Sequence, residues 1–129
     1  MSVAEEGRQP VPEGGPAPHT SAAKSEGRPC CCPFYHEAIE LIGRRWTGAI
    51  VSVLIQGSAL RFGEIGEAVP ELSDRLLSER MKELEARGLV VRTVRPGRPV
   101  RVEYALTEMG RELAPAVYEL ECWARRWLG

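Results

Sequence analysis

The 129-residue sequence predicts a mainly α-helical fold with one small β-hairpin, and three observations support this fold class. Apolar residues recur at helical spacing in four blocks between residues 34 and 84. Alternation typical of strands replaces that spacing between residues 89 and 106, and a final helical stripe follows. Apolar residues make up 43 % of the chain and charged residues 27 %, which excludes a fibrous or wholly disordered protein.

The N-terminal segment differs in composition from the rest of the chain. Residues 1–29 hold five of the ten prolines, and their only large aliphatic side chains are Val3 and Val11. Such a segment cannot bury enough apolar surface to offset its ordering entropy. We therefore expect a disordered tail over 1–29 and one folded domain over 30–129. No stretch resembles a secretory signal or a spanning helix, so we expect a cytoplasmic protein with no membrane partner.

The four helical blocks each have an apolar stripe and a local stop signal. They run from Phe34 to Gly43, from Trp46 to Gly57, from Phe62 to Pro70 and from Ser73 to Gly88. In the fourth block Ser73 is the expected N-cap and Gly88 the expected C-cap. Its stripe of Leu77, Met81 and Leu84 is expected to face the core.

The hairpin is expected to pair residues 89–94 with residues 100–106 across a turn at 95–99. Thr107 is expected to cap a last helix that is kinked at Pro115, because proline lacks a backbone donor. The stripe of this helix has coiled-coil-like spacing, and it consists of Leu113, Val117, Leu120, Ala124 and Trp127. A lone domain would leave much of this stripe exposed, which predicts a two-fold dimer; a helix folded back onto its own domain is the alternative.

The third and fourth helices, joined by a tight turn, form the pattern of a helix-turn-helix, and the hairpin after them makes it a winged helix-turn-helix. The second helix of such a pair lies in the major groove of DNA. Its candidate DNA-binding residues are Ser73, Arg75, Ser78, Glu79 and Lys82. Glu79 either reads a cytosine amino group or restrains Arg75 or Lys82.

The hairpin adds a basic surface. Residues 92–101 hold four arginines and no acid, and Arg95, Arg98 and Arg101 are the candidate phosphate or minor-groove contacts. The alternative is a solvated turn whose arginines serve solubility. Glu64, Glu67 and Glu71 lie on or beside the other helix of the pair and can face away, so the net charge of −1 does not contradict DNA binding.

These motifs resemble the HxlR-type winged-helix regulators, which are relatives of MarR. The resemblance runs from Cys32 to Trp127. Its motifs are Cys32-Pro33, Ile42 to Thr47, Arg61 to Ile65, Leu72-Ser73, Met81 to Val90, Val102 to Gly110, and Trp123. It implies a homodimeric bacterial transcription regulator that binds a pseudo-palindromic operator in double-stranded DNA. The implied dimer contacts come from the first and last helices, at Phe34, Leu113, Val117, Leu120, Trp123 and Trp127.

The cysteines are Cys30, Cys31, Cys32 and Cys122, and they lack the paired spacing of a zinc site. With only two histidines there is no nucleophile–base pair, so we expect no metal, no cofactor and no enzyme activity. Some members of the resembled family sense quinones, aldehydes or oxidants through a cysteine just before the first helix, where Cys32 lies. Cys32 is therefore the redox candidate, with an oxidant or small molecule as effector.

Several alternatives stay open at this point. The resolving thiol for Cys32 would be Cys122, a neighbouring cysteine or Cys32 of the other subunit, and incidental thiols in a mobile tail are the competing interpretation. His36 either lowers the pKa of Cys32 or is an exposed helical residue, which we favour. Two other classes of function also remain: a winged-helix protein–protein interaction module without DNA binding, and an unrecognised enzyme with a pocket at the dimer interface.

Overall fold

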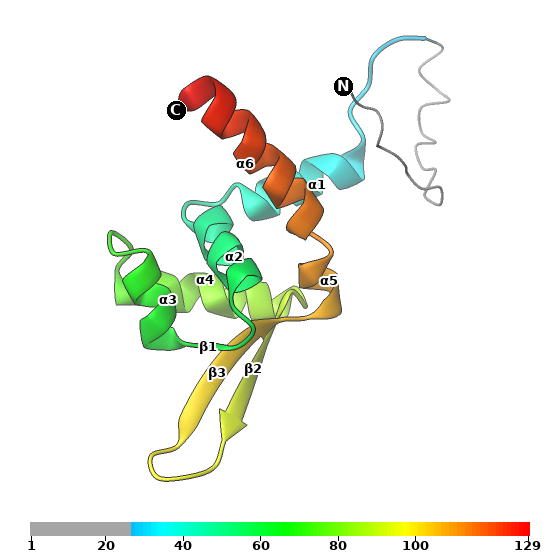
Figure 1. Ribbon diagram of the computed structural model, residues 1–129. Helices are drawn as coiled ribbons and strands as arrows, with labels where there is room; N and C mark the ends of the chain where they lie inside the picture. Colours follow the sequence, from blue (N-terminus) through cyan, green and yellow to red (C-terminus); the bar gives the residue numbers. More distant parts are fainter. Residues whose placement is uncertain (1–26) are drawn as a thin grey trace. The chain divides into compact units, whose positions relative to one another are not determined.

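The computed structural model describes residues 27–129 (Figure 1). The expected tail therefore lies almost entirely outside the described residues, and its boundary at residue 29 stays a prediction. The chain divides into two compact units, one ending at Leu41 and the other comprising Ile42–Gly129. Each unit is described by itself.

The described part of the first unit is a short segment without regular secondary structure and nearly all of helix α1 (Pro33–Ile42). The helix follows the predicted spacing and begins at a proline. Proline is tolerated there because the N–H groups in the first turn of a helix have no helical partner. The Cys32 carbonyl accepts the first helical hydrogen bond from the His36 amide at 3.0 Å. No side chain of α1 is buried, and Phe34 is 77 % exposed.

The second unit holds the remaining helices and a three-stranded antiparallel sheet of order β1-β3-β2. In chain order its elements are α2 (Thr47–Gln56), β1 (Leu60–Arg61), α3 (Phe62–Ala68), α4 (Asp74–Ala86), β2 (Val90–Arg95), β3 (Arg101–Leu106), α5 (Glu108–Arg111) and α6 (Ala114–Leu128). Strand β1 was not predicted, because two residues are too few to show a period. It pairs Leu60 with Tyr104 of β3, while Val90 of β2 pairs with Leu106.

The core of this unit lies where α2, α3 and α4 meet the base of the hairpin. Its largest fully buried aliphatic side chains are Ile50, Leu54, Ile65, Leu77, Met81, Leu84 and Leu89. Each such side chain contributes about 1.5–3 kcal/mol when it leaves water. The predicted stripe of α4 is therefore buried, as the sequence pattern requires.

The predicted N-cap of α4 is confirmed, whereas the C-cap is Arg87 and the predicted Gly88 is the residue after it. The Ser73 hydroxyl accepts a hydrogen bond from the Leu76 amide at 3.2 Å. At the other end Gly88 adopts a φ of 84°, a left-handed conformation that glycine tolerates without strain. The Leu89 amide donates to the Leu84 carbonyl at 2.9 Å and the Gly88 amide to Glu85 at 3.1 Å, which is a Schellman motif. This cap directs the chain from α4 straight into β2.

The single kinked helix predicted after Thr107 is wrong. Thr107 caps the short helix α5, where its hydroxyl accepts from the Gly110 amide at 3.2 Å, and α6 is a separate helix. Pro115 lies in the first turn of α6. Because proline has no N–H to donate to the preceding turn, the helix does not continue through this position and a new helix begins there. Leu113 consequently precedes α6 instead of lying in it.

Trp46 also differs from expectation, since it precedes α2 instead of beginning it. Its φ is 74°, in the left-handed region that a bulky residue rarely adopts, and its side chain is half-buried. Such a conformation costs about 1–3 kcal/mol and persists only where surrounding contacts hold it. The Arg45 guanidinium lies 5.6 Å from the centre of the Trp46 ring, within the range of a cation–π contact.

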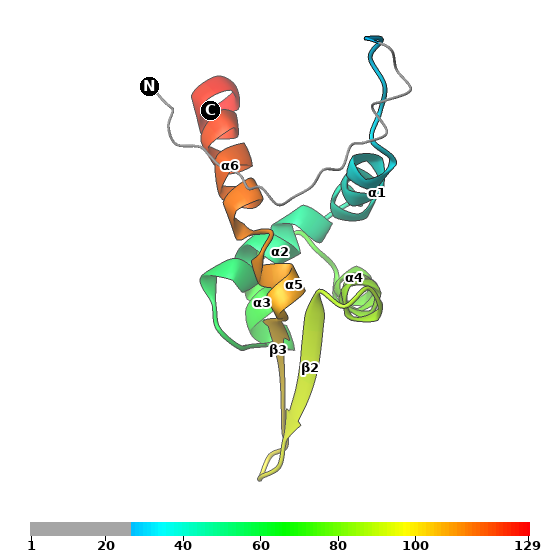
Figure 2. The same cartoon turned by 90° about the vertical axis from the view of Figure 1, so that its right-hand side faces the viewer.

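The hairpin of β2 and β3 projects away from helices α2, α3 and α4 in both views (Figures 1 and 2). Residues 91–101 are exposed throughout, whereas Val90 and Leu106 at the base are buried. The Thr107 hydroxyl donates to the Gly88 carbonyl at 2.6 Å and closes the base. We call residues 90–106 the wing.

Gly110 provides a test of the packing between α5 and the base of the wing. A Cβ at this position would collide with the Leu89 carbonyl oxygen and lie 2.9 Å from a methyl carbon of Leu106. Gly110→Ala is therefore expected to destabilise the protein by about 1–3 kcal/mol, since a backbone atom cannot easily move aside. Urea denaturation followed by circular dichroism measures this change.

The matched control is Gly63→Ala in α3, where an added Cβ meets no atom within 4 Å. Alanine in a helix is favoured over glycine by up to about 1 kcal/mol, so this variant should be neutral or slightly stabilised. Equal stability of the two variants would contradict the packing described for Gly110.

Candidate nucleic-acid interface

The outward face of α4 carries the polar residues that the sequence singled out. The Arg75 side chain is 90 % exposed, and its Nε lies 3.7 Å from Oε2 of Glu79. Of the two roles considered for Glu79, the structure shows the contact with Arg75. Lys82 is exposed and has no ion pair among residues 27–129, and Ser78 is half-buried beside them. This face therefore offers one restrained and one unpaired cation.

Two of the arginines in the wing are restrained by a single carboxylate. Arg95 and Arg101 are directly opposite each other on β2 and β3, a like-charge pair that is unfavourable by itself. Glu103 lies between them: its Oε1 is 2.6 Å from Nε of Arg95 and its Oε2 is 4.0 Å from Nη1 of Arg101. Residues 92–101 contain no acid, and the compensating carboxylate lies two residues beyond this stretch, where the sequence pattern did not indicate it.

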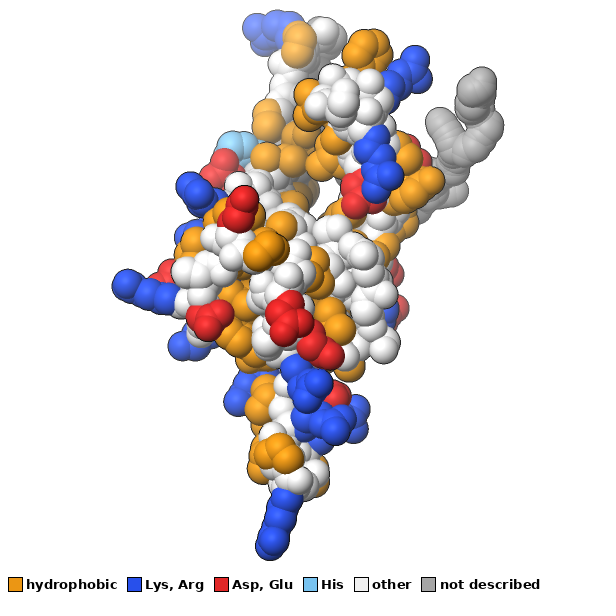
Figure 3. Space-filling model, turned by 60° about the vertical axis from the view of Figure 1, so that its left-hand side comes forward, with side chains coloured by type: hydrophobic (Ala, Val, Ile, Leu, Met, Phe, Trp, Pro, Cys, Tyr) orange, Lys and Arg blue, Asp and Glu red, His pale blue; other side chains and the backbone are white. Residues whose placement is uncertain are grey.

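Arg98 lies in the turn of the wing and has no ion pair within the described part of the chain. The neighbouring Gly97 has a φ of 149°, which a residue with a side chain rarely adopts. Figure 3 shows positively charged side chains, which are all arginines in this segment, gathered along the wing and at its tip, with several acidic side chains on the surface above it. The wing is therefore a positive surface whose outermost cation is unpaired.

The start of α3 is fixed by Arg61 and Glu64. The Arg61 amide donates to Oε1 of Glu64 at 2.8 Å, and Nη2 of the same arginine lies 3.6 Å from Oε2. The hydrogen bond from the Arg61 amide, more than any other contact, lowers the pKa of the Glu64 carboxyl below its ordinary value. The Glu64 carboxylate thus serves as a cap for the helix.

Arg80 is a residue that the sequence analysis missed. Its side chain is buried on the inner side of α4, only 7 % exposed as a residue. Its Nε donates to the Arg45 carbonyl at 2.9 Å and its Nη1 to Oε2 of Glu83 at 3.3 Å. The signal was present in the sequence, because position 80 falls on the apolar stripe, three residues after Leu77 and four before Leu84.

The four thiols are free, and Cys32 is the only one that is half-buried. Cys32 lies directly before α1, at the N-terminal end of the helix, as predicted. His36 is an exposed helical residue, as we favoured, and its Nε2 is directed to Oε2 of Glu40 at 4.0 Å. On α6, a hydrogen bond with the Cys122 side chain raises the pKa of Tyr118.

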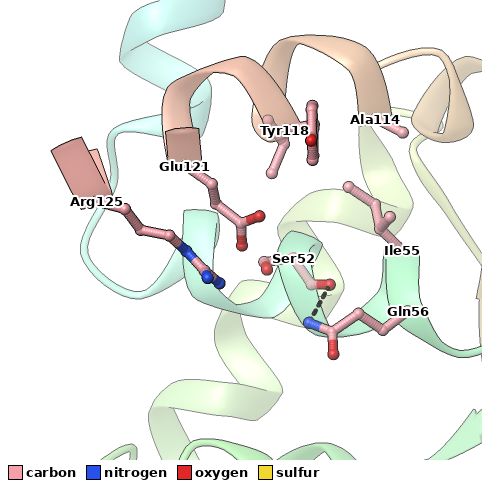
Figure 4. Close-up of a pocket in the computed structure, with 8 residues that line it drawn as sticks. Ser52, Ile55, Gln56, Ala114, Tyr118, Glu121 and Arg125 are labelled. Atoms are coloured by element: carbon pink, nitrogen blue, oxygen red, sulfur yellow. Dashed lines mark hydrogen bonds between the residues drawn. The ribbon is translucent and has the colours of Figure 1, made fainter. Parts of the chain in front are cut away.

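Helix α6 presents two different faces. One face lines a hollow of about 310 Å³ between α6 and α2. The residues around this hollow are Ala114, Val117, Tyr118, Glu121 and Arg125 of α6 and Ser52, Ile55 and Gln56 of α2. Figure 4 shows the Glu121 and Arg125 side chains directed towards α2. The opposite face carries Leu120, Trp123 and Trp127, which are 64 %, 53 % and 65 % exposed. Val117 is thus half-buried on the side of α2, while these three larger side chains are more than half exposed, and the Trp127 ring has the Arg126 guanidinium 5.4 Å from its centre.

Two properties of the described residues bear on other classes of function. No group of three or more His, Cys, Asp or Glu side chains among residues 27–129 is arranged to hold a metal ion. Within the same range, no helix combines the length and the apolar character needed to cross a bilayer.

The sequence profile of the HxlR-like helix-turn-helix family matches residues 41–129. The chain belongs to the HxlR family. It is 48 % identical over 97 residues to YvaP of Bacillus subtilis, an uncharacterised HTH-type transcriptional regulator; the match covers 75 % of this chain and 89 % of YvaP. It is also 45 % identical over 93 residues to the transcriptional regulator YodB of the same organism, covering 72 % of this chain and 82 % of YodB.

Solved structures agree with this membership of the HxlR family. The reduced form of YodB superposes with a TM-score of 0.68 at 43 % identity, covering 76 % of this chain and 95 % of YodB. The redox regulator HypR in its oxidised form gives a TM-score of 0.68 at 37 % identity, over 74 % of this chain and 96 % of HypR. The protein is therefore an HxlR-type transcription regulator with a winged-helix fold, and not an enzyme.

Proposed function

We propose that this HxlR-type regulator binds double-stranded operator DNA as a homodimer, with α4 as the recognition helix in the major groove and the wing on the adjacent backbone. One observation carries the proposal: the outward face of α4 and the tip of the wing belong to one unit, and both present cations that are unpaired within the described chain. Such cations neutralise phosphates and release counterions. The site of action is then the cytoplasm, where the DNA lies.

Each DNA-contacting residue has a distinct role in this proposal. Arg75 and Lys82 reach base edges or flanking phosphates, and the Arg75–Glu79 pair narrows the directions that Arg75 samples. Ser73 and Ser78 supply short hydroxyl groups near the start of the helix. Arg98 contacts phosphate or enters the minor groove from the tip of the wing. Arg95 and Arg101, aligned by Glu103, provide further positive charge at fixed positions.

Arg98→Ala tests the contact by the wing. The variant should weaken binding to any duplex and reduce the slope of log affinity against log salt by about one, the effect of one lost phosphate contact. Arg75→Ala and Lys82→Ala should in addition lower the ratio of operator to random-sequence affinity. Gel-shift titrations at several salt concentrations measure both quantities, with DNA from the intergenic region beside the coding sequence as operator probe.

Arg111→Ala is the control, since it removes the same charge from an exposed position on α5. It should leave both quantities nearly unchanged. If the wild type does not bind DNA, or binds it with an affinity that does not depend on salt, a protein–protein interaction module is favoured instead.

The homodimer is proposed from the exposed apolar face of α6. Leu120, Trp123 and Trp127 form a patch of the kind that marks an interface, and Phe34 on α1 is also exposed. Leu113 and Val117 are half-buried and lie at the edge of this interface. A two-fold dimer of this kind would place the two α4 helices about 34–36 Å apart, matching half-sites one helical turn apart.

Leu120→Asp would place an unpaired charge in this interface and should give monomers. Analytical ultracentrifugation at micromolar concentration measures the association, and circular dichroism checks the fold. Trp127→Ala should raise the dimer dissociation constant without adding a charge. Glu119→Lys, which changes the charge of α6 beside the patch, should remain dimeric. A wild-type monomer at this concentration would contradict the proposal.

Thiol-based sensing is proposed for Cys32. Its position directly before α1, its partial burial and the membership of the HxlR family support this choice. YodB has been solved in reduced, diamide-treated and quinone-bound forms, and HypR in reduced and oxidised forms. An adduct or disulfide at Cys32 would need a coupling of only about 1–3 kcal/mol to change operator affinity about 5- to 150-fold.

Operator binding before and after treatment with diamide or a quinone tests this role. The wild type should change its affinity, and Cys32→Ser should not. Cys31→Ser serves as control, because this neighbouring thiol is exposed and precedes the helix by one residue more. A response by Cys32→Ser equal to that of the wild type would assign the sensing to Cys30, Cys31 or Cys122. No response by the wild type would make the thiols incidental.

A further inference from the structure

The loop at residues 43–46, between α1 and α2, is held by side chains of α4. The first contact is made by Arg80, whose guanidinium is buried and whose Nε donates to the Arg45 carbonyl at 2.9 Å. Because Arg80 points into the protein, it lies on the side of α4 opposite to the exposed Arg75. It therefore cannot take part in the DNA contacts proposed for the outward face.

The second contact uses the carboxylate of Glu83, one turn further along α4. Its Oε2 accepts from Nη1 of Arg80 at 3.3 Å and lies 3.4 Å from Nη2 of Arg44 in the loop. Glu83 thus pairs with one guanidinium on its own helix and with one in the loop. Two linked connections, a hydrogen bond to the Arg45 backbone and an ion pair with Arg44, join α4 to consecutive residues of the loop.

The loop itself has a conformation that requires such support. Trp46 has a φ of 74°, which a bulky residue keeps only where its surroundings impose it. The Thr47 amide donates to the Arg44 carbonyl at 3.0 Å, and the Thr47 side chain is buried. The geometry of the loop and the position of α4 consequently depend on each other.

We infer that Arg80 is a positioning residue for DNA recognition, which holds α4 in register with the loop at 43–46 so that its outward face meets the bases together with the wing. The inference rests on the proposed binding of DNA by α4. A base contact depends on sub-ångström placement of donors, whereas a contact with phosphate tolerates more displacement. Loss of Arg80 should therefore reduce sequence discrimination more than general affinity for DNA.

Arg80→Lys is the variant that tests this role. Lysine keeps the positive charge but cannot reach two partners with a planar fork, so one of the two contacts is lost. The ratio of operator to random-sequence affinity should fall about tenfold, the size of one lost base contact. The affinity for random-sequence DNA and its salt slope should stay unchanged. Glu83→Gln should shift the ratio in the same direction by a smaller factor.

Ile65→Val is the matched control, since it trims a fully buried side chain of α3 that has no contact with the loop through hydrogen bonds or charges. It lowers stability without altering the connections between α4 and the loop, so its discrimination ratio should equal that of the wild type. An equal fall in both variants would show a general effect of destabilisation and overturn the inference.

Hydrogen exchange provides a second measurement that requires no DNA. The Thr47 amide should exchange faster in Arg80→Lys than in the wild type, while Ile65→Val should leave it unchanged. If the wild type binds DNA but Arg80→Lys has unchanged sequence discrimination or unchanged Thr47 exchange, the role of Arg80 is overturned and the proposed function stands. A wild type that binds no DNA at any salt concentration would overturn the proposed function, and with it the role of Arg80 in recognition.

Discussion

The burial of one face of α4 is the constraint on which the rest of the second unit depends. Leu77, Met81 and Leu84 enter a core shared with Ile50 of α2 and Ile65 of α3. A helix with 3.6 residues per turn that buries this stripe must turn the remaining positions outward. The polar face proposed for DNA is thus exposed as a consequence of apolar packing, and no separate interaction is needed to present it.

The same core determines where the wing begins. Because Leu84 and Leu89 are both buried across the Schellman motif, the chain leaves α4 at a fixed angle and enters β2 with Val90 in the core. The base is closed by Thr107 and by Leu106. The tip receives no such support, since every residue from 91 to 101 is exposed. A wing anchored at one end and free at the other suits a surface that follows a phosphate backbone.

The pairing of the charges, more than the net charge, decides which cations are available to contact DNA. A net charge of −1 says little about DNA, because several cations are held by acids on their own side of the fold. Glu103 restrains Arg95 and Arg101, and Glu83 restrains Arg80. Within the described residues, Arg98 and Lys82 remain without such a partner, and they lie where the proposed DNA would pass.

The sequence by itself determined the helices of the core, the N-cap at Ser73, the glycine at Gly88 that ends α4 and the hairpin, since period and turn chemistry are local properties. Only the tertiary structure decided the rest. Strand β1 is too short to show a period, the break before α6 depends on how the chain resumes at Pro115, and the contact of Glu103 with Arg95 depends on strand register. Arg80 donates a hydrogen bond to the Arg45 carbonyl, 35 residues away in the sequence. Sequence periodicity carries no information about which distant residues pair in this way.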